Sequence, residues 1–275
     1  MKYIDIHCHL DFPDYDKDRD GVFARMVDKQ VGVITIGTDL ESSKRAVEIA
    51  EENENVWACI GIHPNEGAPS LVIREGLSEV RGDELFSAEE FQTLVQNPKV
   101  VAIGECGLDY FRIKDESEKD IQKKLFIEQI EFALKHNKPL MLHCRNSYDD
   151  VLDILESYKE AAGPEAEKLR GNAHFFAGDI EQAKRFLDLG FSMSFTGVIT
   201  FTHDYDEVIK YLPMNAIMSE TDAPFVAPVP YRGKRNEPPY VIEVVKKIAE
   251  IKGIDKAFCR ETILQNAKNM FGLLK

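Results

Sequence analysis

The chain has 275 residues, of which 44% are hydrophobic, and a formal net charge of −14 at pH 7. This length suits one large domain, while the acidic balance opposes non-specific attraction to nucleic acid, which depends on Lys and Arg. The sequence contains no apolar run of transmembrane length and no signal-peptide pattern, so we expect a cytoplasmic protein without a membrane span.

Eight short apolar segments predict β-strands. In chain order they are residues 3–9, 31–37, 56–62, 99–105, 139–144, 172–176, 191–195 and 216–220. Because they are almost continuously apolar rather than alternating, they are typical of parallel strands that are buried on both faces.

Amphipathic patterns between these strands predict helices. They cover residues 19–29, 40–52, 88–95, 118–136, 147–158, 180–188, 204–211 and 239–251. Strict alternation of strand and helix, repeated eight times, predicts a closed (β/α)8 TIM barrel in which residues 1–275 form one domain. An open doubly wound sheet is the alternative, but no glycine-rich phosphate loop follows an early strand.

Two long irregular stretches, residues 64–87 and 223–238, follow predicted strand ends. In a barrel this is the catalytic face. Five scattered cysteines without a CxxC pair argue against disulfides and a zinc ribbon, so we expect small buried hydrophobes at these positions. They are Cys8, Cys59, Cys106, Cys144 and Cys259.

His7 and His9 stand two residues apart at the end of the first predicted strand. Side chains at this spacing share one face of a strand, and buried imidazoles require partners, of which a metal ion is the simplest. Taken alone, the pair could equally be two exposed or hydrogen-bonded histidines.

Other predicted strand ends carry ionisable residues too, and together with His7 and His9 they hold five of the seven histidines. These further residues are His63 on the third strand, Glu105 on the fourth, His143 on the fifth, His174 on the sixth and Asp222 on the eighth. Because these ends meet at one mouth of a barrel, we expect a site for two divalent cations, Zn, Mg or Mn. Glu105 is suited to bridge them because a carboxylate has two oxygens.

The remaining residues near these ends have simpler explanations. His136 ends a predicted helix, where a histidine interacts favourably with the helix dipole. His203 precedes a predicted helix, so helix entry and substrate contact are both open. Glu220 is expected to have a lesser role than Asp222.

Six segments resemble the TatD family of metal-dependent deoxyribonucleases, within the amidohydrolase-like barrel superfamily. They are residues 5–10 (DIHCHL), 61–64 (GIHP), 103–110 (IGECGLDY), 142–145 (LHCR), 174–178 (HFFAG), and 220–224 (ETDAP) with 232–238 (RGKRNEP). The resemblance extends over the whole chain. Asn65 and Cys106 depart from the family pattern, where a histidine and an aliphatic residue are commoner.

The resemblance implies a two-metal hydrolase. One ion would be held by His7, His9, Glu105 and Asp222, and the other by Glu105, His143 and His174. From its place at the eighth strand, we predict that Asp222 also accepts the proton of the attacking water. Glu105 and Asp222 are thus the predicted catalytic residues.

Substrate contacts are predicted for His63 and His203, and for the guanidinium groups of Arg145, Arg232 and Arg235, which match phosphate oxygens. A solvated basic loop is the alternative for the arginines. A pocket at a barrel mouth admits a strand end more easily than a duplex, so we expect an exonuclease on single-stranded DNA. Similarity to the family suggests 3′-to-5′ digestion. We identify no obligate protein partner.

Two other functions remain open. The same metals could hydrolyse an ester, lactone or amide in a small molecule or an aminoacyl-nucleic acid, because fold and metals do not fix the substrate. The protein could also be a metal-stabilised scaffold, although structural zinc sites are typically closed and rich in cysteine.

Overall fold

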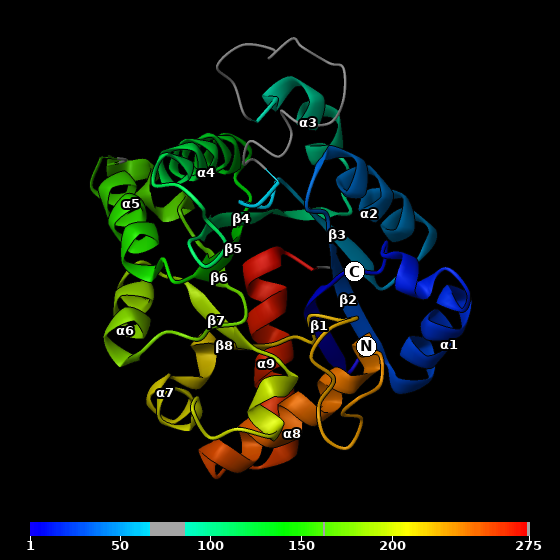
Figure 1. Cartoon of the computed structure of the whole chain (residues 1–275). Coiled ribbons are helices and arrows are strands. Elements are labelled where there is room, and N and C mark those ends of the chain that lie inside the picture. The colour runs from blue at the N-terminus through cyan, green and yellow to red at the C-terminus, as the bar shows by residue number, and fades with distance from the viewer. Residues whose placement is uncertain (67–85, 162, 274–275) are drawn as a thin grey trace.

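A ring of eight parallel strands, ordered β1 to β8, forms the centre of the molecule (Figure 1). The computed structural model describes residues 1–66, 86–161 and 163–273. The strands are β1 (Tyr3–Cys8), β2 (Val31–Ile36), β3 (Val56–Ile60), β4 (Val100–Asp109), β5 (Leu140–Arg145), β6 (Gly171–Ala173), β7 (Ser192–Phe195) and β8 (Ile217–Ser219). The predicted (β/α)8 barrel is confirmed.

Helices alternate with the strands and, except for the last, surround the ring (Figure 1). They are α1 (Arg19–Lys29), α2 (Leu40–Glu52), α3 (Ala88–Val95), α4 (Ser117–His136), α5 (Tyr148–Ala161), α6 (Ile180–Asp188), α7 (Asp206–Tyr211), α8 (Val241–Lys252) and α9 (Lys256–Phe271). Short 3-10 helices are η1 (Pro13–Tyr15), η3 (Gly163–Lys168), η4 (Gly197–Thr200), η5 (Met214–Ala216) and η6 (Pro238–Tyr240). No helix in the described ranges is long and apolar enough to cross a membrane.

The barrel closes where the end of β1 meets the segment after β8. The backbone N–H of Asp222 donates to the carbonyl of His7 at 2.9 Å, and the N–H of His9 donates to the carbonyl of Ala223 at 2.8 Å. Cys8 and Ala223 form a parallel bridge between these bonds. We call this junction the β1–β8 seam.

Strand β4 extends further than predicted, so Glu105 lies inside it rather than at its end. The pairing of β4 with β5 shifts register between Ile103 and Cys106, and such a bulge re-aims a side chain. Gly107 has φ of +133°, and a Cβ there would collide with the carbonyl oxygen of His143. The missing side chain lets β4 continue beside β5 past Glu105.

Strand β6 is shorter than predicted, because it ends at Ala173. Phe175 has φ of +45°, which is incompatible with an extended strand. Its N–H instead donates to Glu220 Oε1 at 2.7 Å. Most of the predicted irregular segment 64–87 lies outside the described residues. All five cysteines are free and buried, as predicted.

Helix α9 is not among the predicted helices. In Figure 1 it lies across the middle of the ring rather than around it. The Asn266 amide donates to the carbonyls of Met214 and Ile217 at 2.7 and 2.8 Å, which places α9 at the amino end of the barrel. A polar residue on the buried face weakens the apolar stripe that predicts a helix.

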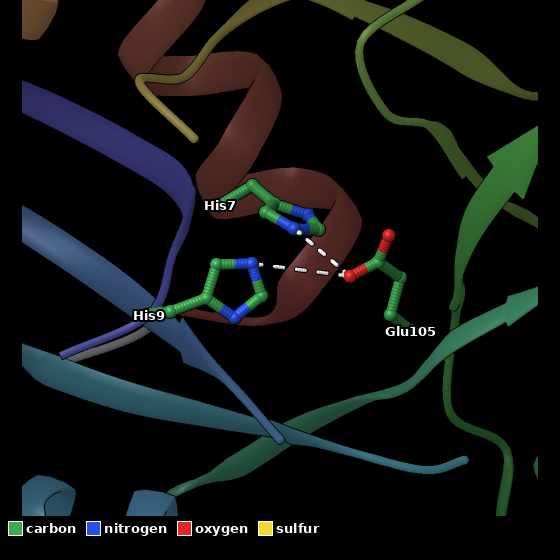
Figure 2. A group of neighbouring side chains, drawn as sticks. All are labelled: His7, His9 and Glu105. Carbon is green, nitrogen blue, oxygen red and sulfur yellow. Dashed lines mark ion pairs between the residues drawn. The ribbon is translucent and has the colours of Figure 1, made fainter. Parts of the chain in front are cut away.

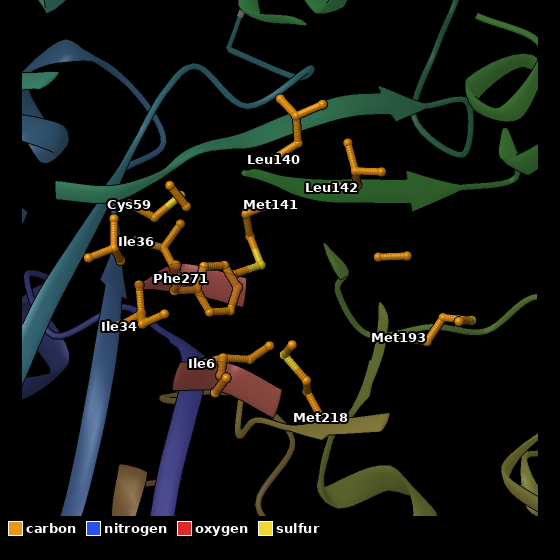
Figure 3. Packing of buried hydrophobic residues seen from close by; sticks show 14 of the residues in the cluster. Ile6, Ile34, Ile36, Cys59, Leu140, Met141, Leu142, Met193, Met218 and Phe271 are labelled. Carbon is orange, nitrogen blue, oxygen red and sulfur yellow. The ribbon is translucent and has the colours of Figure 1, made fainter. Parts of the chain in front are cut away.

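Phe271, at the end of α9, reaches the barrel interior. Figure 3 shows its ring among buried side chains of the strands, including Ile34, Ile36 and Met141. The ring is 4% exposed. This helix therefore covers the end of the barrel opposite the predicted site.

We expect Phe271→Ala to lower the free energy of unfolding by about 3–5 kcal/mol, because it removes a buried aromatic ring and leaves a cavity. Urea unfolding followed by circular dichroism measures this loss. Phe258→Ala is the matched control on the same helix, since Phe258 is 55% exposed, and we expect a change within about 0.5 kcal/mol. Equal losses in the two variants would contradict this role of Phe271.

Candidate metal centre

Glu105 lies between two groups of imidazoles. On one side, its Oε2 is 3.4 Å from His7 Nε2 and 4.0 Å from His9 Nε2 (Figure 2). Asp222 completes this group, with Oδ1 3.9 Å from His7 Nε2 and 3.5 Å from His9 Nε2. The β1–β8 seam fixes the spacing of His7, His9 and Asp222, because it joins their backbones directly.

On the other side, Glu105 Oε1 is 2.7 Å from His143 Nδ1 and 3.1 Å from His174 Nε2. His143 belongs to β5, and His174 follows β6, with its N–H donating to the carbonyl of Leu142 at 2.9 Å. The two oxygens of one carboxylate thus face different sets of ring nitrogens. Ligand atoms in both sets lie close enough together to hold a metal ion.

The buried state of His7 supports a metal at this place. Its side chain is fully buried, yet among the described residues neither ring nitrogen has a hydrogen-bond partner. Leaving such atoms unpaired is costly, and coordination of a cation by Nε2 would remove part of that cost. The donor set of imidazoles and carboxylates matches what borderline divalent ions prefer.

Two buried carboxylates contact the second group of histidines from behind. Asp109 Oδ2 is 3.2 Å from His143 Nε2, and Glu220 Oε1 is 3.3 Å from His174 Nδ1. Asn65 donates its amide to Asp109 Oδ2 at 2.9 Å. Carboxylates in this position orient a ligating imidazole and raise its basicity.

The ionisation of the site reflects these contacts. Burial alone would raise the pKa of Glu105, but the surrounding imidazoles, His174 foremost, lower it well below its usual range. Burial would lower the pKa of His174, yet Glu220 and then Glu105 raise it well above the normal value. Burial also opposes ionisation of Asp109, but hydrogen bonds from His143 and Asn65 lower its pKa to about 2. Glu105 and Asp109 are therefore ionised, and their negative charges suit a bound cation.

Asp222 has an unusual backbone. Its φ is +55°, a left-handed conformation that is uncommon for residues other than glycine. The β1–β8 seam holds it there through the N–H bond to His7. Such strained residues cluster at functional sites.

A cavity of about 560 Å³ opens above this cluster. The predicted ligands His9, Glu105, His143, His174 and Asp222 line it. His7 lies beneath them, with its ring stacked on that of His174 at 3.7 Å between centroids. The structure therefore brings all six predicted metal ligands together.

Some of the residues predicted to contact substrate line the cavity, and others make contacts elsewhere. His63 lines the cavity, with Nε2 3.6 Å from Glu105 Oε1, and burial lowers its pKa to about 3. Arg145 also lines the cavity. His203 is exposed and pairs with Asp206, and its contact with substrate stays a prediction.

Arg232 and Arg235 make other contacts. The Arg232 guanidinium lies over the ring of Phe201, 3.7 Å from its centroid. Arg235 pairs with Asp18 at 2.7 Å and with Glu237 at 3.0 Å. Neither is among the described residues that line the cavity, and their contact with substrate stays a prediction.

Asp109 is absent from the site residues predicted from the sequence, and Glu220 was expected to have only a lesser role. Asp109 ends β4 four residues after Glu105, so both reach the same mouth only because the strand is longer than predicted. Its place in the segment 103–110, one of the segments that carry the family resemblance, was the signal that could have identified Asp109.

Comparison with known proteins agrees with this geometry. A family model described as TatD related DNase matches residues 4–272. An uncharacterized metal-dependent hydrolase of Bacillus subtilis, YabD, is 38% identical over 270 residues, which are 97% of this chain and 98% of the relative. The 3′-5′ ssDNA/RNA exonuclease TatD of Shigella flexneri is 30% identical over 278 residues, which are 98% of each chain.

A solved structure has the same fold. The crystal structure of YjjV, a TatD homologue from Escherichia coli, aligns with a TM-score of 0.83 and 28% identity over 99% of both chains. The match of the family model over nearly the whole length, together with the identity to YabD, shows that the chain belongs to the TatD family of metal-dependent hydrolases.

Proposed function

We propose that this protein is a 3′-to-5′ exonuclease that removes nucleotides from the ends of single-stranded DNA with the help of two divalent metal ions. The observation that carries the proposal is the position of Glu105, whose two oxygens face two separate sets of imidazoles beneath one cavity. The name of the Shigella flexneri relative supports the substrate and the polarity.

In this proposal, His7, His9, Glu105 and Asp222 hold one ion, and Glu105, His143 and His174 hold the other. When bound, a pair of divalent ions lowers the pKa of water and stabilises charge on a phosphodiester during in-line displacement. The residues of the chain position the ligand atoms, and one of them accepts the proton of the attacking water.

Asp222 is the proposed proton acceptor. Burial would raise its pKa, but the hydrogen bond with His9 and the nearby imidazoles lower it, so the carboxylate is ionised at neutral pH. As the oxygen of water bonds to phosphorus, the phosphorus bond to the leaving oxygen breaks. Asp222 takes the proton that the water loses and then releases it to solvent, while the leaving oxygen takes up a proton from solvent and ends as a hydroxyl.

The negative charge of the chain favours binding of DNA at one place, the cavity, rather than along a broad surface. With a net charge of −14, attraction for a polyanion must be confined to places where positive groups gather. Arg112 and Arg145 line the cavity beside the metal centre, and guanidinium groups bind phosphate oxygens bidentately. Binding there requires no basic face that grips a duplex.

Metal removal tests the proposal directly. We expect chelator-stripped protein to leave end-labelled single-stranded DNA intact, and Mg, Mn or Zn added singly to restore shortening from the 3′ end. Asp222→Asn should lower the rate by at least about 100-fold, the scale of general base catalysis, while its thermal unfolding stays close to that of the parent. Metal-independent digestion, or normal activity of Asp222→Asn, would refute the mechanism. No digestion by protein that binds two ions would favour an ester or amide substrate.

Asp109 provides a test that does not depend on the substrate. We expect Asp109→Asn to weaken binding of one ion by about 10–100-fold, because the amide cannot support His143 as a carboxylate does. Titration with Zn or Mn in a calorimeter, or against a chelating dye, measures the affinity. Asp28→Asn, at an exposed carboxylate paired with Lys29, is the control. Unchanged affinity in Asp109→Asn would exclude this support.

A further inference from the structure

The cavity has two walls of different chemistry. Phe12 and Phe225 line it from the segments after β1 and β8, and we call them the aromatic wall. Arg145, the last residue of β5, and Arg112, which follows β4, form the basic wall. In a closed ring of eight strands, the β1–β8 pair lies across from the β4–β5 pair. The aromatic and basic walls therefore face each other.

The rings of the aromatic wall contact one another in a series that begins at His9 of the candidate metal centre. The ring of Phe12 lies against that of His9, with centroids 4.7 Å apart and planes inclined by 27°. Phe225 meets Phe12 edge to face at 5.9 Å and 81°. Phe225 is 50% exposed, so much of its side chain makes no contact with the hydrophobic core.

Phe225 is held in place by its backbone. Its N–H donates to the carbonyl of Asp222 at 2.8 Å. Its own carbonyl accepts from the amide of the fully buried Asn236 at 2.6 Å, and the same amide donates to the carbonyl of Thr221 at 2.9 Å. The exposed ring is thus tied to the segment that carries Asp222.

The basic wall is free to take an anion. The Arg145 guanidinium lies flat on the ring of Phe111, with Cζ 3.8 Å from the centroid. Within the described ranges it has no carboxylate partner, in contrast to Arg235, which pairs with Asp18 and Glu237. A guanidinium oriented by stacking keeps its N–H groups for phosphate oxygens.

We propose that the aromatic wall is a binding site for an unpaired nucleobase, which stacks on Phe225 while the basic wall binds the backbone phosphates. This inference rests on the proposed function and specifies its substrate as a nucleotide with an exposed base. Aromatic rings stack on every base without sequence preference. A paired base presents no free face, so the site selects single strands or frayed ends.

The test compares two single-stranded oligonucleotides that differ only at the 3′ residue, which carries a base in one and is abasic in the other. We expect wild-type protein to cleave the base-bearing strand about tenfold faster at low concentration, the scale of one stacking contact. Phe225→Ala should bring this ratio close to one. Phe225→Tyr should keep the ratio, whereas Phe225→Leu, which retains apolar bulk without an aromatic face, should lose it.

Phe258→Ala, at an exposed ring on α9, is the control and should keep the wild-type ratio. Arg145→Ala should slow cleavage of both strands by the same factor. If Phe225→Ala slows both strands equally, or if Phe225→Leu keeps the ratio, the stacking proposal is wrong even though the exonuclease proposal stands.

Binding without cleavage separates the two proposals. In chelator, fluorescence of a 3′-terminal 2-aminopurine should be quenched when wild-type protein binds the strand, and less so with Phe225→Ala. Quenching that depends on Phe225, in a protein that fails to cleave DNA whichever metal is added, would keep the base site and reject the exonuclease. Absence of any quenching difference would overturn the base site.

Discussion

The β1–β8 seam is the constraint on which the metal centre depends. A barrel must join its first and last strands, and here the joining hydrogen bonds run through the backbones of His7, His9 and Asp222. Asp5 reinforces the junction, because its buried carboxylate accepts hydrogen bonds from the N–H and the hydroxyl of Thr221. The contact that closes the fold is therefore the same one that sets the distances between candidate ligands from opposite ends of the chain.

Glu105 shows how the fold tolerates charge in its interior. An isolated carboxylate at this depth would be unfavourable, but imidazoles on both sides hold it ionised. The register shift in β4 turns the side chain toward them, and Gly107 lets the strand continue to Asp109. One irregular strand thus supplies both the carboxylate between the two sets of histidines and the carboxylate behind His143. The geometry of the candidate metal site and the local departure from ideal strand structure have the same origin here.

The arginines differ in what they are free to do. Arg235 stabilises the segment after β8 by pairing with Asp18 and Glu237, so its charge is largely neutralised within the protein. Arg145 is oriented by Phe111 at the cavity. Under the proposed function, the positive charge of Arg145 would attract a polyanion to this mouth of a strongly acidic chain. The residue type alone did not distinguish these two situations.

Much of this architecture was predictable from local patterns. Apolar strands alternating with amphipathic helices predict the barrel, and the spacing of His7 and His9 identifies the mouth, because periodicity and residue chemistry are properties of short segments. The bulge around Glu105, the support of His143 by Asp109, the position of α9 with its buried Asn266, and the facing aromatic and basic walls were decided by tertiary structure. They depend on contacts between residues far apart in the chain, whose energies arise only when the barrel closes and brings the strand ends together.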